Sequence, residues 1–138
     1  MKIMGLDYGS KTVGVALSDD LLLTAQPVET ITRDSEKRLR RTLARIEELV
    51  RENRVSLIVL GLPLLPDGSE GERAEKTREF QRMLANRVLI EIKLIDERFT
   101  TDAANEELQQ MGVKKENRKQ VIDQLAACHI LEDYLHSL

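Results

Sequence analysis

A continuous apolar run, SLIVLG at residues 56–61, limits most strongly how this chain can fold. Such a run, rich in β-branched residues, is typical of a central strand that is covered on both faces. Gly61 and Pro63 end it. Both faces of a sheet are covered when helices pack on each side, so the run indicates an α/β domain.

Four more segments are predicted to form strands. KIMGLD (2–7) and TVGVALSD (12–19) are expected to pair antiparallel across a tight YGSK connection. Alternation places Val13, Val15 and Leu17 on one face of the second strand, and Gly14 leaves little bulk on the other. TAQPVETIT (24–32) is a plausible third strand, in which Pro27 suits an edge better than a centre. VLIEIKLID (88–96) is the last strand.

Helical periodicity predicts the remaining elements. A first helix is expected over residues 33–53, capped by Asp34 or Ser35, and a second over about 72–85. A short helix is expected from Thr100 or Thr101 to about residue 111, where Gly112 stops it, and a last helix over about 115–135. The order predicts one domain, residues 1–138, with a five-stranded mixed sheet. A three-strand meander is followed by two parallel strands, and helices flank the sheet.

Two acidic positions fall at strand ends. Asp7 ends the first strand, and Asp96 and Glu97 end the last. If these strands run parallel, both ends lie at the same edge of the sheet, where open α/β sheets usually bind ligands.

A third acid, Asp123, lies within the apolar stripe of the last helix. Its stripe neighbours are Ala126, Ala127, Ile130 and Tyr134. A short carboxylate in such a stripe faces the sheet, and burying it without a partner costs several kcal/mol. A divalent cation would satisfy all three acids, because oxygen ligands suit Mg²⁺ or Mn²⁺.

Each acid also has an ordinary structural explanation. Asp7 could form a turn or cap a helix, one of Asp96 and Glu97 could pair with Arg98, and Asp123 could bond a backbone N–H. Taken together with a consistent topology, the three acids favour a metal site.

Composition narrows the class of protein. The 138 residues carry a net charge of −3, so the chain as a whole does not attract nucleic acid. Positive charge is clustered, however, with eight basic residues against five acids over 33–54 and a second group at 114–119. The single cysteine excludes an internal disulfide, and Asp7 interrupts the N-terminal apolar stretch. We therefore expect a cytoplasmic protein that does not associate with membranes.

Four stretches resemble one known family in order and spacing. GLDYGSKTVGVALSD, LIVLGLPLLPDGSEG, LIDERFTTDAA and VIDQLAACHILEDYL are similar to the motifs of the YqgF/RuvX family, and the resemblance covers essentially the whole chain. Members are described both as Holliday-junction-resolvase-like proteins and as pre-16S rRNA nucleases. The resemblance implies an RNase H-like fold and a nuclease with clustered carboxylates and two metal ions, Mg²⁺ or Mn²⁺.

The resemblance also assigns site residues. The family's catalytic and metal-binding acids fall on Asp7, Glu97 and Asp123, with Glu97 preferred over Asp96 for its longer reach. The implied reaction is attack of a metal-activated water on a phosphodiester. Candidates for substrate phosphate contacts are Lys11, Arg98, Lys114, Lys115, Arg118 and Lys119. For the basic residues at 33–54, a solvated outer helix face is the stronger interpretation.

The implied function is hydrolysis of phosphodiester bonds in structured RNA, at the 5′ end of pre-16S rRNA during ribosome biogenesis. One alternative is a Holliday junction resolvase on branched DNA, which would act as a homodimer because a junction needs two active sites. Another is a non-catalytic RNA-binding maturation factor. A nucleotide-binding phosphotransferase is a weaker alternative, since GLDYGSKTVGVA also resembles the phosphate-binding start of actin-like ATPases and sugar kinases, which need two such domains.

Overall fold

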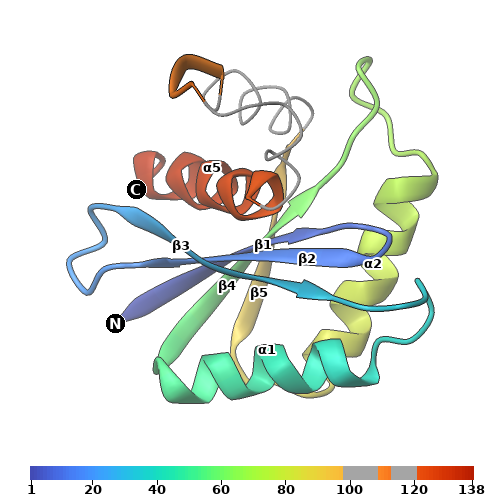
Figure 1. Ribbon diagram of the computed structural model, residues 1–138, viewed down its shortest axis with the longest axis horizontal. Coiled ribbons are helices and arrows are strands. Elements are labelled where there is room, and N and C mark those ends of the chain that lie inside the picture. The colour runs from blue at the N-terminus through green and yellow to red at the C-terminus, as the bar shows by residue number, and fades with distance from the viewer. Residues whose placement is uncertain (98–108, 113–120) are drawn as a thin grey trace.

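A five-stranded mixed sheet forms the centre of the protein, with helices on both faces (Figure 1). The computed structural model describes residues 1–97, 109–112 and 121–138. The strand order is β3-β2-β1-β4-β5. No helix in these ranges combines the length and apolar character needed to cross a membrane.

The first three strands form the predicted antiparallel meander: β1 (Lys2–Tyr8), β2 (Thr12–Ser18) and β3 (Ala25–Thr32). Pro27 lies on β3, which is an edge strand, as its missing N–H requires. Val15 pairs with Glu29 and Ala16 pairs with Pro27, so the register shifts between them and Val28 has no counterpart. This bulge bends the edge strand.

The last two strands run parallel to the first. β4 (Val55–Leu62) pairs with β1, and β5 (Glu91–Asp96) pairs with β4. The crossovers contain α1 (Arg40–Glu52) and α2 (Glu72–Ala85), the second of which has the predicted bounds. The expected α/β architecture, a meander followed by two parallel strands, is confirmed.

The first helix begins seven residues later than predicted, at Arg40, and neither Asp34 nor Ser35 caps it. The cause is Arg33, which is only 9% exposed. Its backbone N–H donates to the Lys11 carbonyl at 2.8 Å, and its guanidinium donates to the carbonyls of Gly9 at 2.6 Å and Glu36 at 3.3 Å. These bonds hold the chain against the β1–β2 turn, where a helix cannot continue.

The last helix, α5 (Ile122–His136), also starts later than expected. Val121 has a φ of −123°, so the predicted helix is not continuous from residue 115, and residues 113–120 lie outside the described ranges. The predicted short helix lies mostly outside them as well. Gln109 and Gln110 are helical, and Gly112 has a φ of +79°, a conformation that suits a residue ending a helix.

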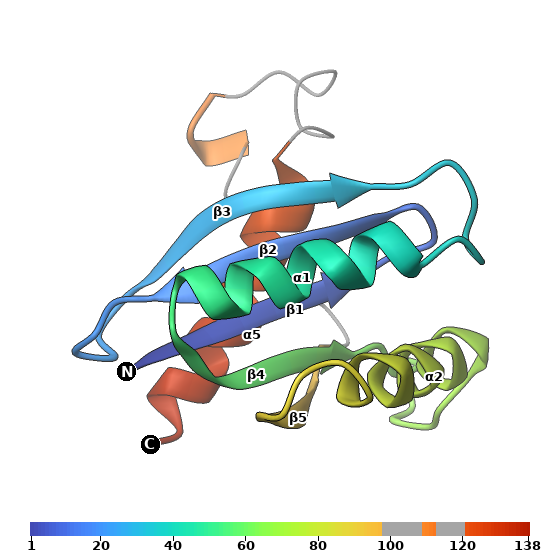
Figure 2. The same cartoon turned by 90° about the horizontal axis from the view of Figure 1, so that it is seen from below.

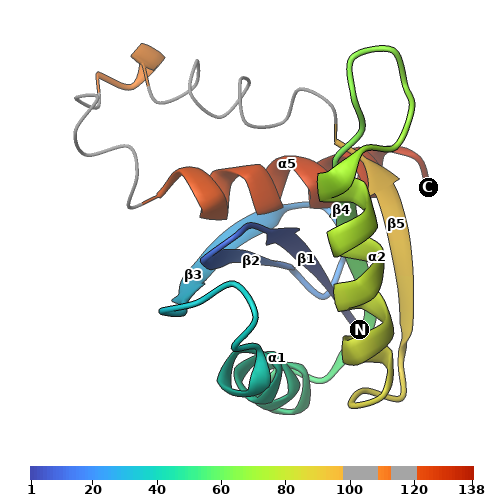
Figure 3. The same cartoon turned by 90° about the vertical axis from the view of Figure 1, so that its right-hand side faces the viewer.

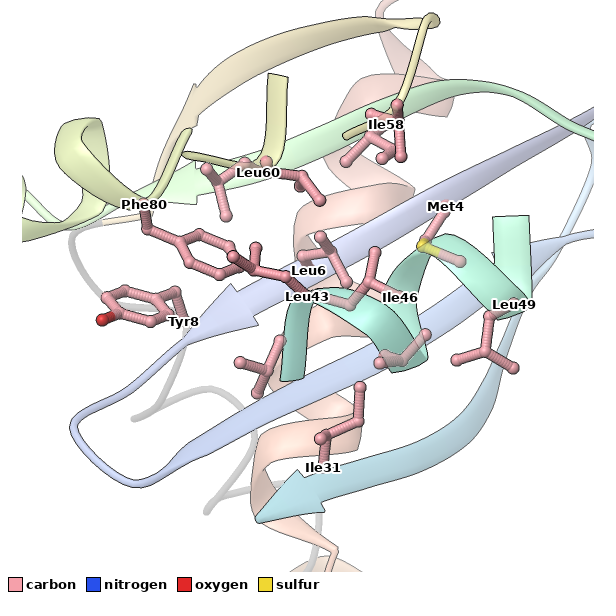
Figure 4. Packing of buried hydrophobic residues seen from close by; sticks show 14 of the residues in the cluster. Met4, Leu6, Tyr8, Ile31, Leu43, Ile46, Leu49, Ile58, Leu60 and Phe80 are labelled. Atoms are coloured by element: carbon pink, nitrogen blue, oxygen red, sulfur yellow. The ribbon is translucent and has the colours of Figure 1, made fainter. Parts of the chain in front are cut away.

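The sheet separates two hydrophobic clusters. α1 and α2 pack on one face, over Met4, Leu6 and Tyr8 of β1, and α5 packs on the other (Figures 2 and 3). Figure 4 shows the first cluster, in which Phe80 lies beside Tyr8. Val13, Val15 and Leu17 all belong to it, as their alternation predicted. Because side chains alternate along a strand, Gly5 and Asp7 face α5.

Glycines on the α5 face of the sheet allow this helix to lie unusually close. A Cβ on Gly5 would lie 2.7 Å from the Ala127 carbonyl oxygen and 2.9 Å from Leu131 Cβ. A Cβ on Gly14 would overlap the carbonyl oxygen of Asp123. The sheet therefore contacts the helix backbone directly, which a side chain at either glycine would prevent.

We expect Gly5→Ala to lower the free energy of unfolding by about 3 kcal/mol, because the added methyl meets helix backbone that cannot move independently. Gly71→Ala is the matched control: there a Cβ would meet only the Leu65 side chain at 3.3 Å, which can rotate away. Urea unfolding of both variants measures the difference. Equal stability of the two variants would contradict the close seating of α5.

Candidate active site

One pocket, of about 380 Å³, brings the three predicted acids together at the carboxyl edge of the parallel strands. Its lining residues are Asp7, Tyr8, Gly9, Ser10, Pro63, Arg73, Glu97 and Asp123. Asp7 comes from the end of β1, Glu97 follows β5, and Asp123 lies in the first turn of α5. The topology that the sequence predicted therefore places all three acids around one space.

The structure distinguishes Glu97 from Asp96. Asp96 is the last paired residue of β5, opposite Leu62, and its side chain is exposed. The Glu97 N–H donates to the Leu62 carbonyl at 3.2 Å, which extends the strand pairing by one residue. A Cβ on Gly61 would lie 2.5 Å from the Glu97 carboxyl carbon, so this glycine makes room for the Glu97 side chain. Glu97 is thus the acid that lines the pocket.

Asp7 and Glu97 interact directly. Burial raises the pKa of Asp7 to about 6, with the charge of Asp123 as the next cause. Burial, followed by the charge of Asp7 and a hydrogen bond to it, raises the pKa of Glu97 to about 9. At neutral pH a protonated Glu97 therefore donates to an ionised Asp7, since two buried like charges in contact disfavour each other.

Asp123 is positioned by the seating of its helix. Gly14 is the β2 partner of Asp7, and the Asp123 backbone lies directly over Gly14. The charge of Asp123 consequently acts on Asp7. The missing side chain at Gly14 is what allows an acid on α5 to reach an acid on β1.

Arg73 is the pocket residue that sequence reasoning missed. It lies in the first turn of α2 and lowers the pKa of both Asp7 and Glu97 through its charge. Its Nη1 forms a 2.7 Å salt bridge with Glu36, while its buried Nη2 has no hydrogen-bond partner among the described residues. The signal for it was topological: the loop after β4 must return to the helix at the same sheet edge as the acids.

Tyr8 and Arg33 support the turn beside Asp7. The Tyr8 ring stacks on Phe80 at 4.2 Å between centroids, and the Arg33 guanidinium lies 5.0 Å from the Tyr8 ring centre. Arg33 also holds the Gly9 carbonyl. Tyr8 is only 6% exposed, so its ring is a core contact and not an open platform for bases.

Of the six predicted phosphate contacts, one falls within the described residues. Lys11 is exposed and does not line the pocket, and its carbonyl accepts the backbone N–H of Arg33. The other five candidates lie outside the described residues: Arg98, Lys114, Lys115, Arg118 and Lys119.

The chemistry of the pocket suits a metal ion, but the present arrangement of its side chains does not form a complete metal site. Within residues 1–97, 109–112 and 121–138, no three acidic, histidine or cysteine side chains are close enough to hold one ion together. The donors are nevertheless all carboxylate oxygens, and the raised pKa values mean that Asp7 and Glu97 need added positive charge before both can ionise. Divalent cations with a preference for oxygen ligands supply such charge.

The fold identifies the structural class of the protein. The chain superimposes on Thermus thermophilus RuvC, in a structure described as a complex with a Holliday junction substrate, with a TM-score of 0.62 over 99% of this chain and 94% of that one. The fowlpox virus resolvase gives a TM-score of 0.61 over 99% and 98% of the two chains. Sequence identity is 15% and 16%, so these likenesses establish the RNase H-like fold of the RuvC-type resolvases.

The sequence places the chain more narrowly. It belongs to the RuvX family, whose model, described as "RuvX: Holliday junction resolvase", matches residues 1–137. A relative from Agathobacter rectalis is 54% identical over 138 residues, covering 100% of this chain and 96% of the relative. One from Lachnospira eligens is 53% identical over 137 residues, covering 99% and 98%. Both carry the name "Putative pre-16S rRNA nuclease", so the family description and the relatives' names agree on a nuclease.

The raised pKa of Glu97 makes stability depend on pH. The native state holds its proton up to about pH 9, whereas the unfolded chain releases it above about 4.5. Unfolding between these values therefore releases a proton, and stability falls as pH rises. In the presence of a chelator we expect the free energy of unfolding to fall by about 1 kcal/mol per pH unit between pH 6 and 8.

Glu97→Gln is the control for this effect, because the amide keeps the size of the side chain but does not titrate. Urea unfolding at several pH values should give a flatter dependence for this variant than for the wild type. The same slope in both proteins would show that Glu97 does not carry the shared proton.

Proposed function

We propose that this protein is a metal-dependent nuclease that hydrolyses phosphodiester bonds in precursor 16S rRNA, at the 5′ end of the mature sequence. The observation that carries the proposal is the pocket in which Asp7, Glu97 and Asp123 meet beside Arg73. The family and the names of its relatives support the choice of reaction and substrate. A catalytic role for the three acids is part of the proposal.

The three carboxylates would hold Mg²⁺ or Mn²⁺, with two ions as the expected number. A bound cation would supply an activated water and offset charge on the phosphate. The chain itself contributes a rigid frame: Asp7 is fixed by strand pairing, Asp123 by the seating of α5, and Glu97 by its backbone bond to Leu62. Such preorganisation lets the charges act without moving during the reaction.

Arg73 provides the positive charge on the protein side. Its Nη2, which has no hydrogen-bond partner in the described part of the chain, is available to donate to a phosphate oxygen. Arginine suits phosphates because of its planar set of N–H groups. Glu36 holds the other end of the guanidinium and keeps it beside the acids. We propose that Arg73 binds the phosphate next to the bond that is cut.

A second function has a specific observation in its favour. The family description names Holliday junction resolvases, and the fold is that of RuvC and the fowlpox resolvase. The same pocket chemistry would cut a DNA junction, because metal-assisted hydrolysis acts on the phosphodiester. A resolvase would require a homodimer with two pockets, so the two functions differ in the oligomer as well as in the substrate.

The central test is cleavage. With Mg²⁺ or Mn²⁺, we expect the wild type to cut an RNA spanning the 5′ end of 16S rRNA, and Asp7→Asn to cut it at least about 100-fold more slowly, because a charged group at the reacting centre is lost. Asp96→Asn is the matched control, since this neighbouring acid does not line the pocket. Gel analysis of end-labelled RNA gives the rates.

The outcomes separate the alternatives. Cleavage of a four-way DNA junction by a dimer, with the RNA left intact, would favour the resolvase. RNA binding without cleavage by the wild type in either metal would favour the non-catalytic maturation factor. Equal rates for Asp7→Asn and wild type would remove Asp7 from the reaction.

Arg73 gives an independent prediction. We expect Arg73→Gln to lower kcat/KM by about 10- to 100-fold, because the phosphate loses a charged donor in a partly buried site. Arg78→Gln is the control: this arginine is five residues further along α2 and pairs with Glu70 at the surface. A similar small effect of both changes would place Arg73 in a structural role.

A further inference from the structure

A second hollow lies on the opposite side of the sheet from α5. It is a groove of about 980 Å³ between the segment that leads into α1 and the C-terminal end of α2. Figures 2 and 3 show these two helices on their shared face of the sheet. Among the described residues that line it, Asp34 is the one acid and six are cationic: Arg33, Lys37, Arg38, Arg40, Arg41 and Arg87. A chain of net charge −3 thus concentrates positive charge in one groove.

Most of these cations lack an acidic partner. No salt bridge within the described ranges (1–97, 109–112 and 121–138) involves Lys37, Arg38, Arg40 or Arg41. By contrast, Arg45, further along α1, binds Glu29 at 2.7 Å and also contacts Glu48. The charge of these four groove residues is therefore not neutralised by an acid in the described part of the chain, and all four line one hollow.

The cations also collect at the end of α1 where they are least favourable. Arg40 and Arg41 lie in its first turn, which contains no acid. The partial positive charge of a helix N-terminus repels cations and attracts anions. The residue before the helix is Leu39, whose side chain cannot accept the first N–H groups. An external anion would satisfy both the N–H groups and the arginines.

Arg33 connects this groove with the acidic pocket. It lines the groove, it is nine-tenths buried, and its Nη1 has no hydrogen-bond partner among the described residues. Its Nη2 donates to the carbonyl of Gly9, which lines the acidic pocket. A third hollow, of about 340 Å³, continues the path, because it shares Tyr8 with the pocket and Lys37 with the groove.

We propose that the groove between α1 and α2 is an anchoring site for the phosphodiester backbone of the nucleic acid strand that the acidic pocket cuts. The proposal rests on the proposed nuclease function for the identity of that strand. The groove holds phosphates at a distance from the cut bond, with Arg38, Arg40 and Arg41 as the main contacts. It reads charge and not base sequence, because the groove is lined by guanidinium groups.

The test is binding, measured on a protein that does not cut. Asp7→Asn serves as the parent, and its affinity for a fluorescein-labelled single-stranded RNA, long enough to span pocket and groove, is followed by fluorescence anisotropy over a series of KCl concentrations. The groove variant adds Arg38→Gln, Arg40→Gln and Arg41→Gln. The matched control adds Arg51→Gln, Arg54→Gln and Arg82→Gln, which remove the same charge outside the groove.

We expect the groove variant to raise the Kd at least about tenfold, and to reduce the salt dependence of log K by about 2, because three phosphate contacts on a single strand are lost. The control should change the Kd less than about twofold. DNA of the same sequence should lose affinity equally, since the contacts are to phosphates. The groove variant should melt at or above the temperature of its parent, because cations leave the first turn of α1.

Equal losses in the groove variant and the control overturn the proposal, as does an unchanged salt dependence. Arg38→Gln alone gives a second measurement if the triple variant melts early, because Arg38 lies before the helix; with no effect there, the proposal also fails. The outcome of this binding measurement does not depend on catalysis, because every protein in it carries the Asp7→Asn change and does not cut the RNA. Failure of the nuclease function would appear instead as an inactive wild type in the cleavage assay.

Discussion

The backbone of α5 lies directly against the sheet, and the acidic pocket depends on this contact. Gly5 and Gly14 have no side chains to hold the helix away, so the carbonyls of Ala127 and Asp123 approach the strands themselves. The helix start thereby comes over the end of β1, and an acid on α5 acts on Asp7. Without this seating, the layer that carries Asp123 would lie further from the strand that carries Asp7.

Bringing acids together in this way is electrostatically unfavourable, and the other groups in the pocket offset the repulsion only in part. Burial and mutual repulsion leave Glu97 protonated beside Asp7, while Arg73 provides one positive charge against three acids. Like charges in a poorly solvated site repel strongly, so the remaining imbalance must be compensated by protons or by cations. Such an excess of negative charge is expected of a site that binds cations during its reaction.

Sequence patterns predicted the sheet and the meeting of the acids because both follow from local signals. Apolar runs locate strands, alternation locates faces, and the parallel order of β1, β4 and β5 places Asp7 and Glu97 at one edge. The patterns failed where a long-range contact decided the outcome. Arg33 has the helical context of its neighbours, but its bonds to Gly9 and Lys11 keep it out of α1. Arg73 looked like any surface residue of α2, because only the folded crossover brings it to the acids.

The same long-range contact relates the two charged regions of the molecule. By displacing the start of α1 to Arg40, Arg33 opens the segment 33–39 and leaves Lys37 and Arg38 beside the helix end, where they line the groove. The β1–β2 turn, which Arg33 holds, therefore borders the acidic pocket, and Arg33 itself lines the basic groove. A strand of nucleic acid, which is uniformly negative, would meet repulsion at the pocket unless cations are bound there, and attraction at the groove. Binding at the groove would thus hold the substrate while cations bind in the pocket. The separation of the two regions allows the attraction at one to act without the repulsion at the other.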